Sequence, residues 1–261
     1  MKIVMIGAGN LATNLAMALK NRGHEIVQVY SRTRESAKKL ARQTVSEDIT
    51  RLTRVVHDAD VYILSVKDDA LEEVLGDFPV KEGFLVHTAG SVPLEVAKDY
   101  VAHYGVLYPL QTFSKERTVD FRQIPLCLEA SSDEKYRVLK NMADDLSEDV
   151  RHITSRQRLH LHVAAVFACN FSNYMMANAE ELLQRQDISF DILAPLIRET
   201  IEKALHDSPS RSQTGPARRG DRQTIDKHLN LLAHSGKLQN LYSFVSNAIT
   251  NDYTTPQNSG K

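Results

Sequence analysis

Short apolar runs alternate with longer amphipathic stretches along the first half of the chain. The apolar runs are rich in β-branched residues and have the length of single strands, whereas most of the stretches between them have helical spacing. The runs read KIVMI, EIVQVY, ADVYILSV, GFLVHTA, YGVLYPL and IPLCLEA. Strands that alternate with helices are typical of a parallel sheet covered on both faces, so the pattern predicts an α/β domain.

The spacing inside the amphipathic stretches predicts where individual helices begin and end. In the first stretch Leu11, Leu15 and Leu19 recur every fourth residue and form one apolar stripe, and Gly23 follows as a stop signal. Asp68 or Asp69 can cap the stretch ALEEVL. After the last apolar run, SSDEKYRVLKNMADDL has the serine and the acidic residues of a capped helix. We expect these helices to pack on the sheet.

From about Ser155 the pattern changes, and helical spacing continues for roughly thirty residues, far beyond the mean helix length. Ser189 can cap the next helical stretch, in which Pro195 should kink or divide the helix. Two more helical stretches, DRQTIDKHLNLLAHS and KLQNLYSFVSNAITNDY, follow a loop at 207–220 that is rich in Ser, Pro, Gly and Arg. The change predicts two domains, a sheet domain at 1–154 and an all-α domain at 155–261.

Composition excludes several classes of partner. Lys and Arg number 32 against 33 Asp and Glu, so the net charge is −1 and no basic excess recruits nucleic acid or an acidic membrane surface. The two cysteines, Cys127 and Cys169, lack metal-ligand spacing and suit a reducing compartment. No apolar run approaches the ~20 residues that span a bilayer, and a strand begins at Lys2 before a signal segment could fit. We therefore expect a cytoplasmic protein with a small-molecule ligand and no metal.

A glycine turn joins the first predicted strand to the first predicted helix. Residues 7–12 read GAGNLA and fit the pattern G-x-G-x-x-G/A. In that pattern the first glycine permits a tight turn, the second lets the backbone approach a diphosphate, and the small last residue lets the helix pack closely. The free N–H groups at the start of the helix then bind the diphosphate. An ordinary strand-to-helix turn is the alternative, but the position of the motif favours dinucleotide binding.

The end of the second strand indicates which dinucleotide is bound. An NAD site normally has Asp or Glu about 20 residues after the glycine motif, where the carboxylate binds the ribose 2′-hydroxyl. Here the sequence is Tyr30-Ser31-Arg32-Thr33. Arg32 can form a charge-assisted pair with a 2′-phosphate, and the hydroxyls of Ser31 and Thr33 can donate to the remaining oxygens. A solvated surface arginine is the alternative, and NADP is the favoured cofactor.

These residues resemble a known group of enzymes. IGAGNLATNLAMAL, YSRT, DADVYILSVKDDAL and HTAGSVPLEV are similar to the cofactor domain shared by pyrroline-5-carboxylate reductase, deazaflavin-dependent NADP oxidoreductase and the 6-phosphogluconate and β-hydroxyacid dehydrogenases. YPLQTFSK, HVAAVFACNFSNYMMANAEELL and TGPARRGDRQTIDKHL resemble a narrower family of Rossmann-like NADP oxidoreductases. The helical C-terminal domain of that family has no assigned function. The resemblance implies an α/β fold, with a Rossmann-type parallel sheet domain and then an all-α domain of the 6-phosphogluconate dehydrogenase C-terminal class.

The resemblance also implies roles for particular residues. The diphosphate would be held by Gly7, Ala8, Gly9, Asn10 and Leu11, and the 2′-phosphate by Ser31, Arg32 and Thr33. The ribose near the nicotinamide would be lined by Ser65, Val66 and Lys67, and the nicotinamide ring would lie near Thr88, Ala89 and Gly90. Related chains often read His-Pro-Leu-Gln-Thr-Phe where this chain has Tyr108 before Pro109. The resemblance implies substrate binding by Tyr108 and Gln111, and because a phenol replaces an imidazole at Tyr108, it leaves a proton-transfer role there open.

The long helix and the late loop supply the candidate catalytic residues. β-Hydroxyacid dehydrogenases have a lysine four residues before a helical asparagine, but if Asn170 is that asparagine, this chain has Val166 at the lysine position. His162 precedes Asn170 by about two turns, or roughly 12 Å along the axis, so the two can bracket a ligand without sharing one atom. Asn173 is the i+3 neighbour of Asn170 and could present a second amide to the substrate. Asn170 could equally be a satisfied polar residue at an interface.

Arg219 and Asp221 form a second group of candidates on the late loop. Arg219 can clamp a carboxylate or phosphate, and Asp221 is expected to cap the following helix whatever else it does. His228 lies about two turns into that helix. The remaining histidines, such as His24, His57 and His152, have no metal-ligand spacing, and surface solvation is their expected state.

The combined prediction is an NADP-dependent oxidoreductase that acts on a small carbonyl, imine or hydroxy-acid-like substrate, with His162 and Asn170 as catalytic candidates. One alternative is a non-catalytic NADP-binding sensor or scaffold, because the usual lysine is missing. Another is a deazaflavin-dependent NADP reductase. The apolar side chains on the long helix exceed what one small domain needs and suggest a homodimer through the C-terminal helices. These side chains are Phe167, Phe171, Tyr174, Met175 and Met176.

Overall fold

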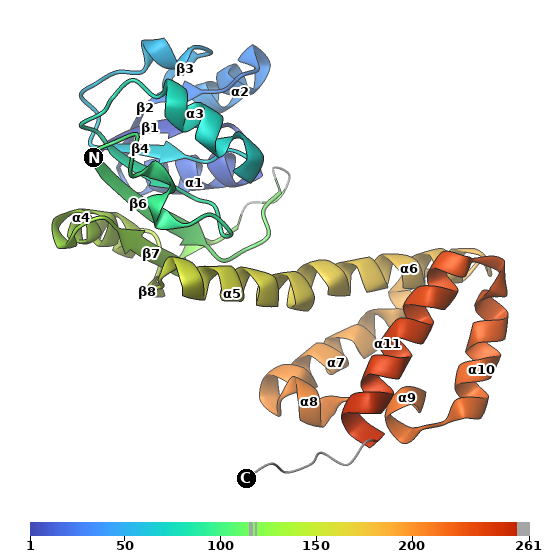
Figure 1. Cartoon of the computed structure of the whole chain (residues 1–261). Helices are drawn as coiled ribbons and strands as arrows, with labels where there is room; N and C mark the ends of the chain where they lie inside the picture. Colours follow the sequence, from blue (N-terminus) through green and yellow to red (C-terminus); the bar gives the residue numbers. More distant parts are fainter. Residues whose placement is uncertain (115–116, 118, 255–261) are drawn as a thin grey trace, which may run out of the picture. The chain divides into compact units, whose positions relative to one another are not determined.

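Strands of the N-terminal part form one sheet in the order β3-β2-β1-β4-β5-β6-β7-β8 (Figure 1). The computed structural model describes residues 1–114, 117 and 119–254. The strands in these residues are β1 Lys2–Ile6, β2 Glu25–Tyr30, β3 Glu47–Ile49, β4 Val61–Leu64, β5 Phe84–His87, β6 His103–Pro109, β7 Leu126–Ala130 and β8 Val150–His152. The order reverses direction between β1 and β4, as it does in doubly wound nucleotide-binding sheets.

The sheet is mostly parallel, as predicted, and one pair of neighbouring strands is antiparallel. β7 pairs antiparallel with β6, and Tyr108 lies opposite Cys127 in that register. A parallel pair needs a long crossover, usually a helix, whereas the described part of the β6–β7 connection contains only the 3-10 turn η4, Phe121–Gln123. The pattern also missed β3 and β8, because each has three residues and no alternation that the sequence could show.

Alternate residues of each strand pack against different helices, as a sheet covered on both faces requires. Ile3 and Met5 of β1 belong to a buried cluster with side chains of α1, α2 and α4. Val4 and Ile6 of the same strand face a second cluster that includes side chains of α3. The helices that cover the sheet are α1 Asn10–Asn21, α2 Arg34–Thr44, α3 Leu71–Asp77 and α4 Asp133–Asp144.

The predicted helix ends are partly confirmed. Gly23 has φ +85° and its N–H donates to the carbonyl of Lys20, so it ends α1 as expected. Ser132 caps α4 and accepts from the N–H of Lys135. The predicted cap at Asp68 or Asp69 is wrong. Both residues lie inside the 3-10 turn η2, Asp68–Ala70, and α3 begins after Ala70 without a side-chain cap.

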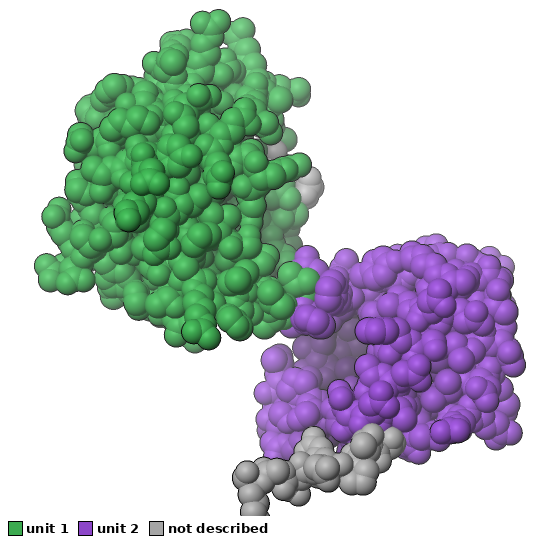
Figure 2. All heavy atoms as spheres, in the orientation of Figure 1, with its two compact units in different colours: residues 1–166 green, residues 167–261 purple. Residues whose placement is uncertain are grey.

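Residues 155–184 are helical throughout, as the long pattern predicts. They comprise α5 Ser155–Ala165, the π-helical segment Val166–Phe171 and α6 Ser172–Gln184. Thr154 and Gln157 form a capping box at the start of α5. The chain divides into two units, Met1–Val166 and Phe167–Lys261, which Figure 2 shows in different colours. The substrate-domain boundary at 154/155 stays a prediction, because a division by contacts does not define where a functional domain begins.

The second unit is helical in its described residues. After α6 its helices are η6 Phe190–Leu193, α7 Ala194–His206, α8 Pro209–Ser212, α9 Pro216–Arg219, α10 Arg222–Leu231, η7 Leu232–His234 and α11 Gly236–Thr254. Pro195 lies in the first turn of α7, where its missing N–H costs nothing, so it divides the predicted stretch as expected. The predicted loop at 207–220 contains the two one-turn helices α8 and α9, each of which begins with proline. Within the described residues, no helix is long and apolar enough to cross a membrane.

Candidate functional site

One cavity lies where the carboxyl ends of the parallel strands meet. β1, β2, β4, β5 and β6 all end at this edge, and residues at or just after the end of each strand line a space of about 630 Å³. This is the edge at which doubly wound sheets bind their ligands. The lining residues are Gly7, Ala8, Gly9, Asn10, Leu11, Ala12, Tyr30, Ser31, Arg32, Ser36, Ser65, Val66, Lys67, Asp68, Ala70, Val74, Thr88, Ala89, Gly90, Tyr108 and His162. The whole lining belongs to the first unit.

The two glycines of the turn have different physical roles. Gly7 has φ +122°, and a Cβ at this position would lie 2.0 Å from the carbonyl oxygen of Ser65, so the turn itself requires glycine. Gly9 has an ordinary φ of −76°, and a Cβ there would meet nothing within 4 Å. No side chain caps the start of α1, so its first N–H groups remain available to an anion beside the open space at Gly9.

The end of β2 brings hydroxyls and one cation to the cavity. Ser31 and Arg32 line it, as does Ser36 in the first turn of α2. Sequence reasoning missed Ser36, although its place in the first turn of the helix that follows Arg32 could have indicated it. Thr33 occupies the cap position of α2 and is not among the lining residues. Its predicted contact with a 2′-phosphate stays a prediction.

Two buried hydroxyls form the wall between β4 and β5. The Thr88 hydroxyl donates to Ser65 Oγ at 3.2 Å, and both side chains are almost fully buried. At the rim the Ser91 hydroxyl donates to the carboxylate of Asp68. Asp68 lines the cavity and was not among the predicted site residues, since the sequence suggested only a helix cap for it. Lys67, at the same strand end, is exposed and also lines the cavity.

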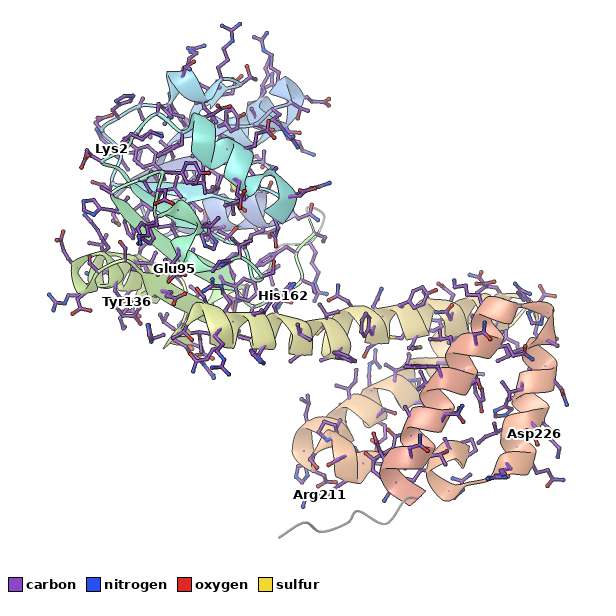
Figure 3. All side chains as sticks on the ribbon, viewed as in Figure 1. Lys2, Glu95, Tyr136, His162, Arg211 and Asp226 are labelled. Atoms are coloured by element: carbon purple, nitrogen blue, oxygen red, sulfur yellow. The ribbon has the colours of Figure 1, made fainter. Side chains whose placement is uncertain are left out.

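A tyrosine–histidine pair closes the far end of the cavity. The Tyr108 hydroxyl lies 3.0 Å from His162 Nδ1, and the two rings meet edge to face with centroids 6.1 Å apart. In Figure 3 His162 lies on the side of α5 that faces the sheet. A Cβ on Gly90 would lie 2.8 Å from His162 Nδ1 and 2.9 Å from the Tyr108 ring, so glycine is needed where the pair meets the β5 loop. Burial raises the pKa of Tyr108, which keeps the phenol protonated at neutral pH.

The other predicted substrate residues do not line this cavity. The side chain of Gln111 is exposed and accepts a hydrogen bond from its neighbour Thr112. The remaining four, which are Asn170, Asn173, Arg219 and Asp221, belong to the second unit. Their placement near the nicotinamide therefore stays a prediction.

Asp221 caps α10, as expected. One of its carboxylate oxygens accepts from the N–H of Thr224 at 3.1 Å, and the other accepts from the Thr224 hydroxyl at 2.8 Å. These hydrogen bonds hold the pKa of Asp221 below its usual range. His228 lies against the hydroxyl of Tyr242, at 2.7 Å, on the same unit.

His87, at the end of β5, gives the fold a pH dependence. The imidazole is fully buried, its Nδ1 accepts from the N–H of Ala89, and burial together with the charge of Arg158 lowers its pKa to about 4. The unfolded chain titrates this group near its ordinary pKa of 6.5, so it holds more protons between pH 6.5 and about 4. We expect the free energy of unfolding to fall over that interval by about 3 kcal/mol from this group.

Urea unfolding at pH 7 and pH 4.5 measures this contribution. A His87→Asn variant keeps an acceptor for the N–H of Ala89 and removes the titration, so its stability should fall less than that of the wild type. His57→Asn is the control, because His57 is exposed. Equal losses in the wild type and His87→Asn would contradict the prediction.

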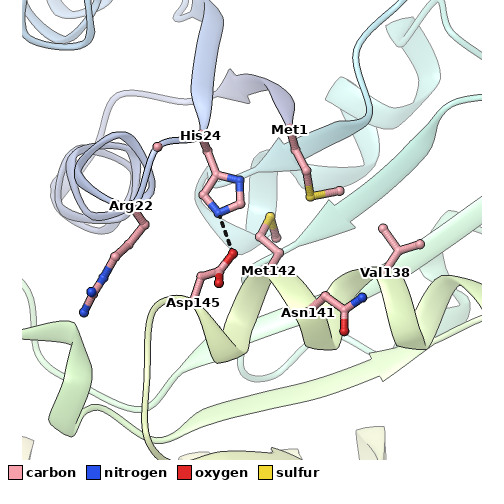
Figure 4. A pocket seen from close by; sticks show the side chains of 8 residues that line it. Met1, Arg22, His24, Val138, Asn141, Met142 and Asp145 are labelled. Carbon is pink, nitrogen blue, oxygen red and sulfur yellow. Dashed lines mark ion pairs between the residues drawn. The ribbon is translucent and has the colours of Figure 1, made fainter.

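A second cavity, of about 460 Å³, lies near the start of β2 and beside α4. Its walls include His24, whose ring points across the space to Asp145 at 3.3 Å (Figure 4). The expectation that His24 is solvated on the surface is wrong: the residue is 8 % exposed, and burial lowers its pKa. His57 and His152 are exposed, as expected. Among the described residues no group of acidic, histidine and cysteine side chains could hold a metal ion.

Comparisons with known proteins indicate the family of the chain. Residues 2–89 match the family described as NADP oxidoreductase, coenzyme F420-dependent, and residues 124–249 match a domain of unknown function, DUF2520. No curated protein matches the chain. Solved structures do, and the match to BF3122 from Bacteroides fragilis, a protein assigned as an NADP oxidoreductase, has 49% identity. That match covers 96% of this chain and 98% of the other, with a TM-score of 0.91.

More distant structures share the fold. The imine reductase from Myxococcus stipitatus, solved in complex with NADP+, is 15% identical over 97% of this chain and 93% of its own, with a TM-score of 0.69. The 1-pyrroline-5-carboxylate reductase from Streptococcus pyogenes is 16% identical over 97% of this chain and 98% of its own, with a TM-score of 0.63.

The glycine turn, the cavity at the strand ends and the 49% identical match over nearly the whole chain together identify the family. The chain belongs to the family of NADP oxidoreductases that join a Rossmann-type domain to a helical DUF2520 domain.

Proposed function

We propose that the protein is an NADPH-dependent reductase of small imines or carbonyl compounds. One observation carries the proposal: a single cavity extends from the glycine turn and Arg32 to the Tyr108–His162 pair. Cofactor recognition and a proton source therefore lie in one continuous space. The fold shared with an imine reductase and a pyrroline-5-carboxylate reductase supports a C=N substrate in particular.

The residues present fit the cofactor. The open space at Gly9 and the uncapped start of α1 suit a diphosphate, and Arg32 with the hydroxyls of Ser31 and Ser36 suits a 2′-phosphate. No acidic residue follows β2 at the position where NAD sites carry one. When bound, NADPH supplies the hydride that reduces the C=N or C=O carbon.

The Tyr108–His162 pair is the candidate proton source. Because burial keeps the phenol protonated, Tyr108 can donate its hydrogen to His162 Nδ1, and a proton can then be carried on His162 Nε2. His162 is half-buried at the cavity wall and can deliver the Nε2 proton to the nitrogen or oxygen of the substrate as its carbon is reduced, while the Tyr108 hydroxyl passes its own proton to Nδ1 and regains one from water afterwards. α5 thus supplies the imidazole of this proposed proton source.

A panel of substrates tests the proposal. NADPH consumption is measured with cyclic imines, with amine and ketone mixtures, and with α-keto and hydroxy acids. We expect turnover with cyclic imines and with some of the carbonyl compounds. Tight NADPH binding without consumption in the presence of any of them would instead favour a non-catalytic NADP sensor.

A deazaflavin reaction is the second candidate, and the family matched by residues 2–89 is the observation that favours it. In that case hydride passes between NADPH and a bound deazaflavin. Adding deazaflavin to the same assay distinguishes the two, because NADPH would be consumed without any imine or carbonyl compound.

The Arg32 guanidinium should determine the preference for NADPH over NADH. Loss of a charge-assisted contact to phosphate costs about 1.5–3 kcal/mol, so Arg32→Ala should weaken NADPH binding about 10- to 150-fold and leave NADH binding nearly unchanged. Calorimetry on the purified variants measures both affinities. Arg34→Ala is the matched control, because Arg34 is exposed in the same turn and does not line the cavity. Equal affinity of the wild type for the two cofactors would contradict NADP specificity.

The second unit is proposed to complete the substrate pocket and to form a homodimer. In the described part of the chain, every exposed large apolar side chain except Met1 and Val45 lies at or beyond Leu159, which supports an interface on the C-terminal helices. Sedimentation equilibrium at micromolar concentration should then give a dimer, and a monomer would contradict the proposal.

The free cysteines Cys127 and Cys169 support a cytoplasmic location, which cell fractionation tests.

The proposed pocket residues Asn170, Asn173, Arg219 and Asp221 require a separate test. A crystal of the NADP complex places them directly. Asn170 and Arg219 beyond water-bridged reach of the nicotinamide, in both subunits, would show that the assignment is wrong.

A further inference from the structure

A buried ion pair lies behind the Tyr108–His162 pair. Arg158 is 1% exposed and is among the largest fully buried side chains of the described residues. Its Nη1 donates to Glu129 Oε2 at 2.9 Å. Burying two charges costs several kcal/mol per ion before their attraction is counted, so a buried pair is weak evidence for stability. The position of this pair suggests another role.

The ion pair joins three separate segments. Glu129 is on β7, and Arg158 is in the first turns of α5. Arg158 Nη2 donates to the carbonyl of Val92, at 2.5 Å, in the loop that follows β5. Ser155 completes the network, because its hydroxyl donates to Glu129 at 2.6 Å and accepts from the N–H of Leu94 at 2.8 Å.

Each of these segments carries or borders a part of the proposed proton source. His162 lies four residues after Arg158, which places both on one face of α5. Tyr108 pairs with Cys127 on β7, two residues before Glu129. Val92 lies two residues after Gly90, where an added Cβ would lie 2.8 Å from His162 Nδ1 and 2.9 Å from the Tyr108 ring. A shift of any one segment would change the 3.0 Å contact between the Tyr108 hydroxyl and His162.

We infer that the Arg158–Glu129 ion pair positions the Tyr108–His162 pair, and that its buried charges are retained for this purpose. Arg158 and Glu129 are positioning residues, since neither lines the cavity. Burial raises the pKa of Glu129, but hydrogen bonds from Ser155 and Arg158 outweigh it and leave the pKa below its usual range. The pair therefore stays charged near neutral pH. The inference rests on the proposed function for its effect on turnover, but its effect on the contact itself can be measured without a substrate.

The test is a double-mutant cycle that crosses Tyr108→Phe with the double variant Arg158→Met/Glu129→Gln. Replacing both charges avoids leaving one of them buried and unpaired, so this background should fold. Histidine NMR of the His162 ring at fixed pH is the substrate-independent readout. In the wild type Tyr108→Phe should shift the His162 ring resonances, and in the double-variant background the same change should have almost no effect.

Turnover is the second readout. The double variant should lower kcat about 10- to 100-fold, because a displacement of about 1 Å at reacting groups can cost that much. NADPH affinity should stay within about twofold, because the Arg32 end of the cavity is untouched. The control is Arg151→Met/Asp149→Asn, which removes a 2.6 Å ion pair at the surface near β8 and should change neither readout.

The outcomes separate the two proposals. An equal NMR effect of Tyr108→Phe in both backgrounds overturns the positioning role, whatever the enzyme turns over. Failure to find any substrate, with the NMR coupling present, refutes the proposed function and leaves the positioning role supported. If the double variant does not fold, the single variant Arg158→Lys takes its place in the cycle. Lysine keeps the positive charge beside Glu129 but lacks the second nitrogen that donates to the carbonyl of Val92. This variant should then show the same loss of coupling.

Discussion

A Gly9→Val variant should lose NADPH affinity by more than about 100-fold and keep the stability of the wild type. Gly9 has an ordinary φ, and a Cβ there would meet no protein atom within 4 Å, so we expect valine to cause little strain in the free protein. The same side chain occupies the space beside the start of α1 that a diphosphate needs. Losing two charge-assisted hydrogen bonds of about 1.5–3 kcal/mol each exceeds 100-fold in affinity.

Calorimetry with NADPH and urea unfolding of the free protein measure the two halves of this prediction. Gly7→Ala is the contrasting variant, because φ is +122° there and the new Cβ would lie 2.0 Å from the Ser65 carbonyl oxygen. We expect that change to destabilise the fold itself. Gly23→Ala is the second control: it strains a left-handed residue away from the cavity and should lower stability without changing affinity. Wild-type affinity in Gly9→Val would mean that the cofactor binds elsewhere.

His162→Gln should lower kcat about 10²- to 10⁴-fold, the range typical of removing a general acid or base. Glutamine can still accept a hydrogen bond from Tyr108 but cannot carry a proton near neutral pH. NADPH affinity should change less than about twofold, because His162 lies at the end of the cavity opposite Arg32. Steady-state kinetics with the best imine or carbonyl substrate from the panel measures kcat, and calorimetry measures the affinity.

His160→Gln is the matched control for this prediction. His160 lies two residues earlier on the same helix, is exposed and bonds to the carbonyl of Arg156, so kcat should not change. Tyr108→Phe should lower kcat by a smaller factor than His162→Gln, since it removes only the partner of the proton carrier. Undiminished turnover in His162→Gln would assign proton transfer to another group.

The features that the sequence predicted correctly depend on neighbours in the chain. The apolar runs gave the longer strands, and the serine at 132 and the glycine at 23 marked helix ends, because caps and stops act within one turn. The GAGNLA turn and Ser31-Arg32 lie directly after strands whose ends share one edge of the sheet. Parallel pairing alone therefore brings them to one cavity. Even Asp221 was found as a cap, since its partner Thr224 is three residues away.

Contacts between distant segments were decided only by the tertiary structure. Nothing near Tyr108 in the sequence indicates that His162, 54 residues later, supplies its hydrogen-bond partner. The antiparallel turn of the sheet at β7 places Glu129 beside α5, and the resulting burial of Arg158 contradicts the usual exposure of arginine. Local patterns determine which segments become strands and helices and which strand ends carry the glycine turn and Ser31-Arg32. The free energy of burying the Arg158–Glu129 ion pair and of placing the Tyr108 and His162 rings in contact depends on which segments pack together. The packing of the whole sheet decides which segments these are.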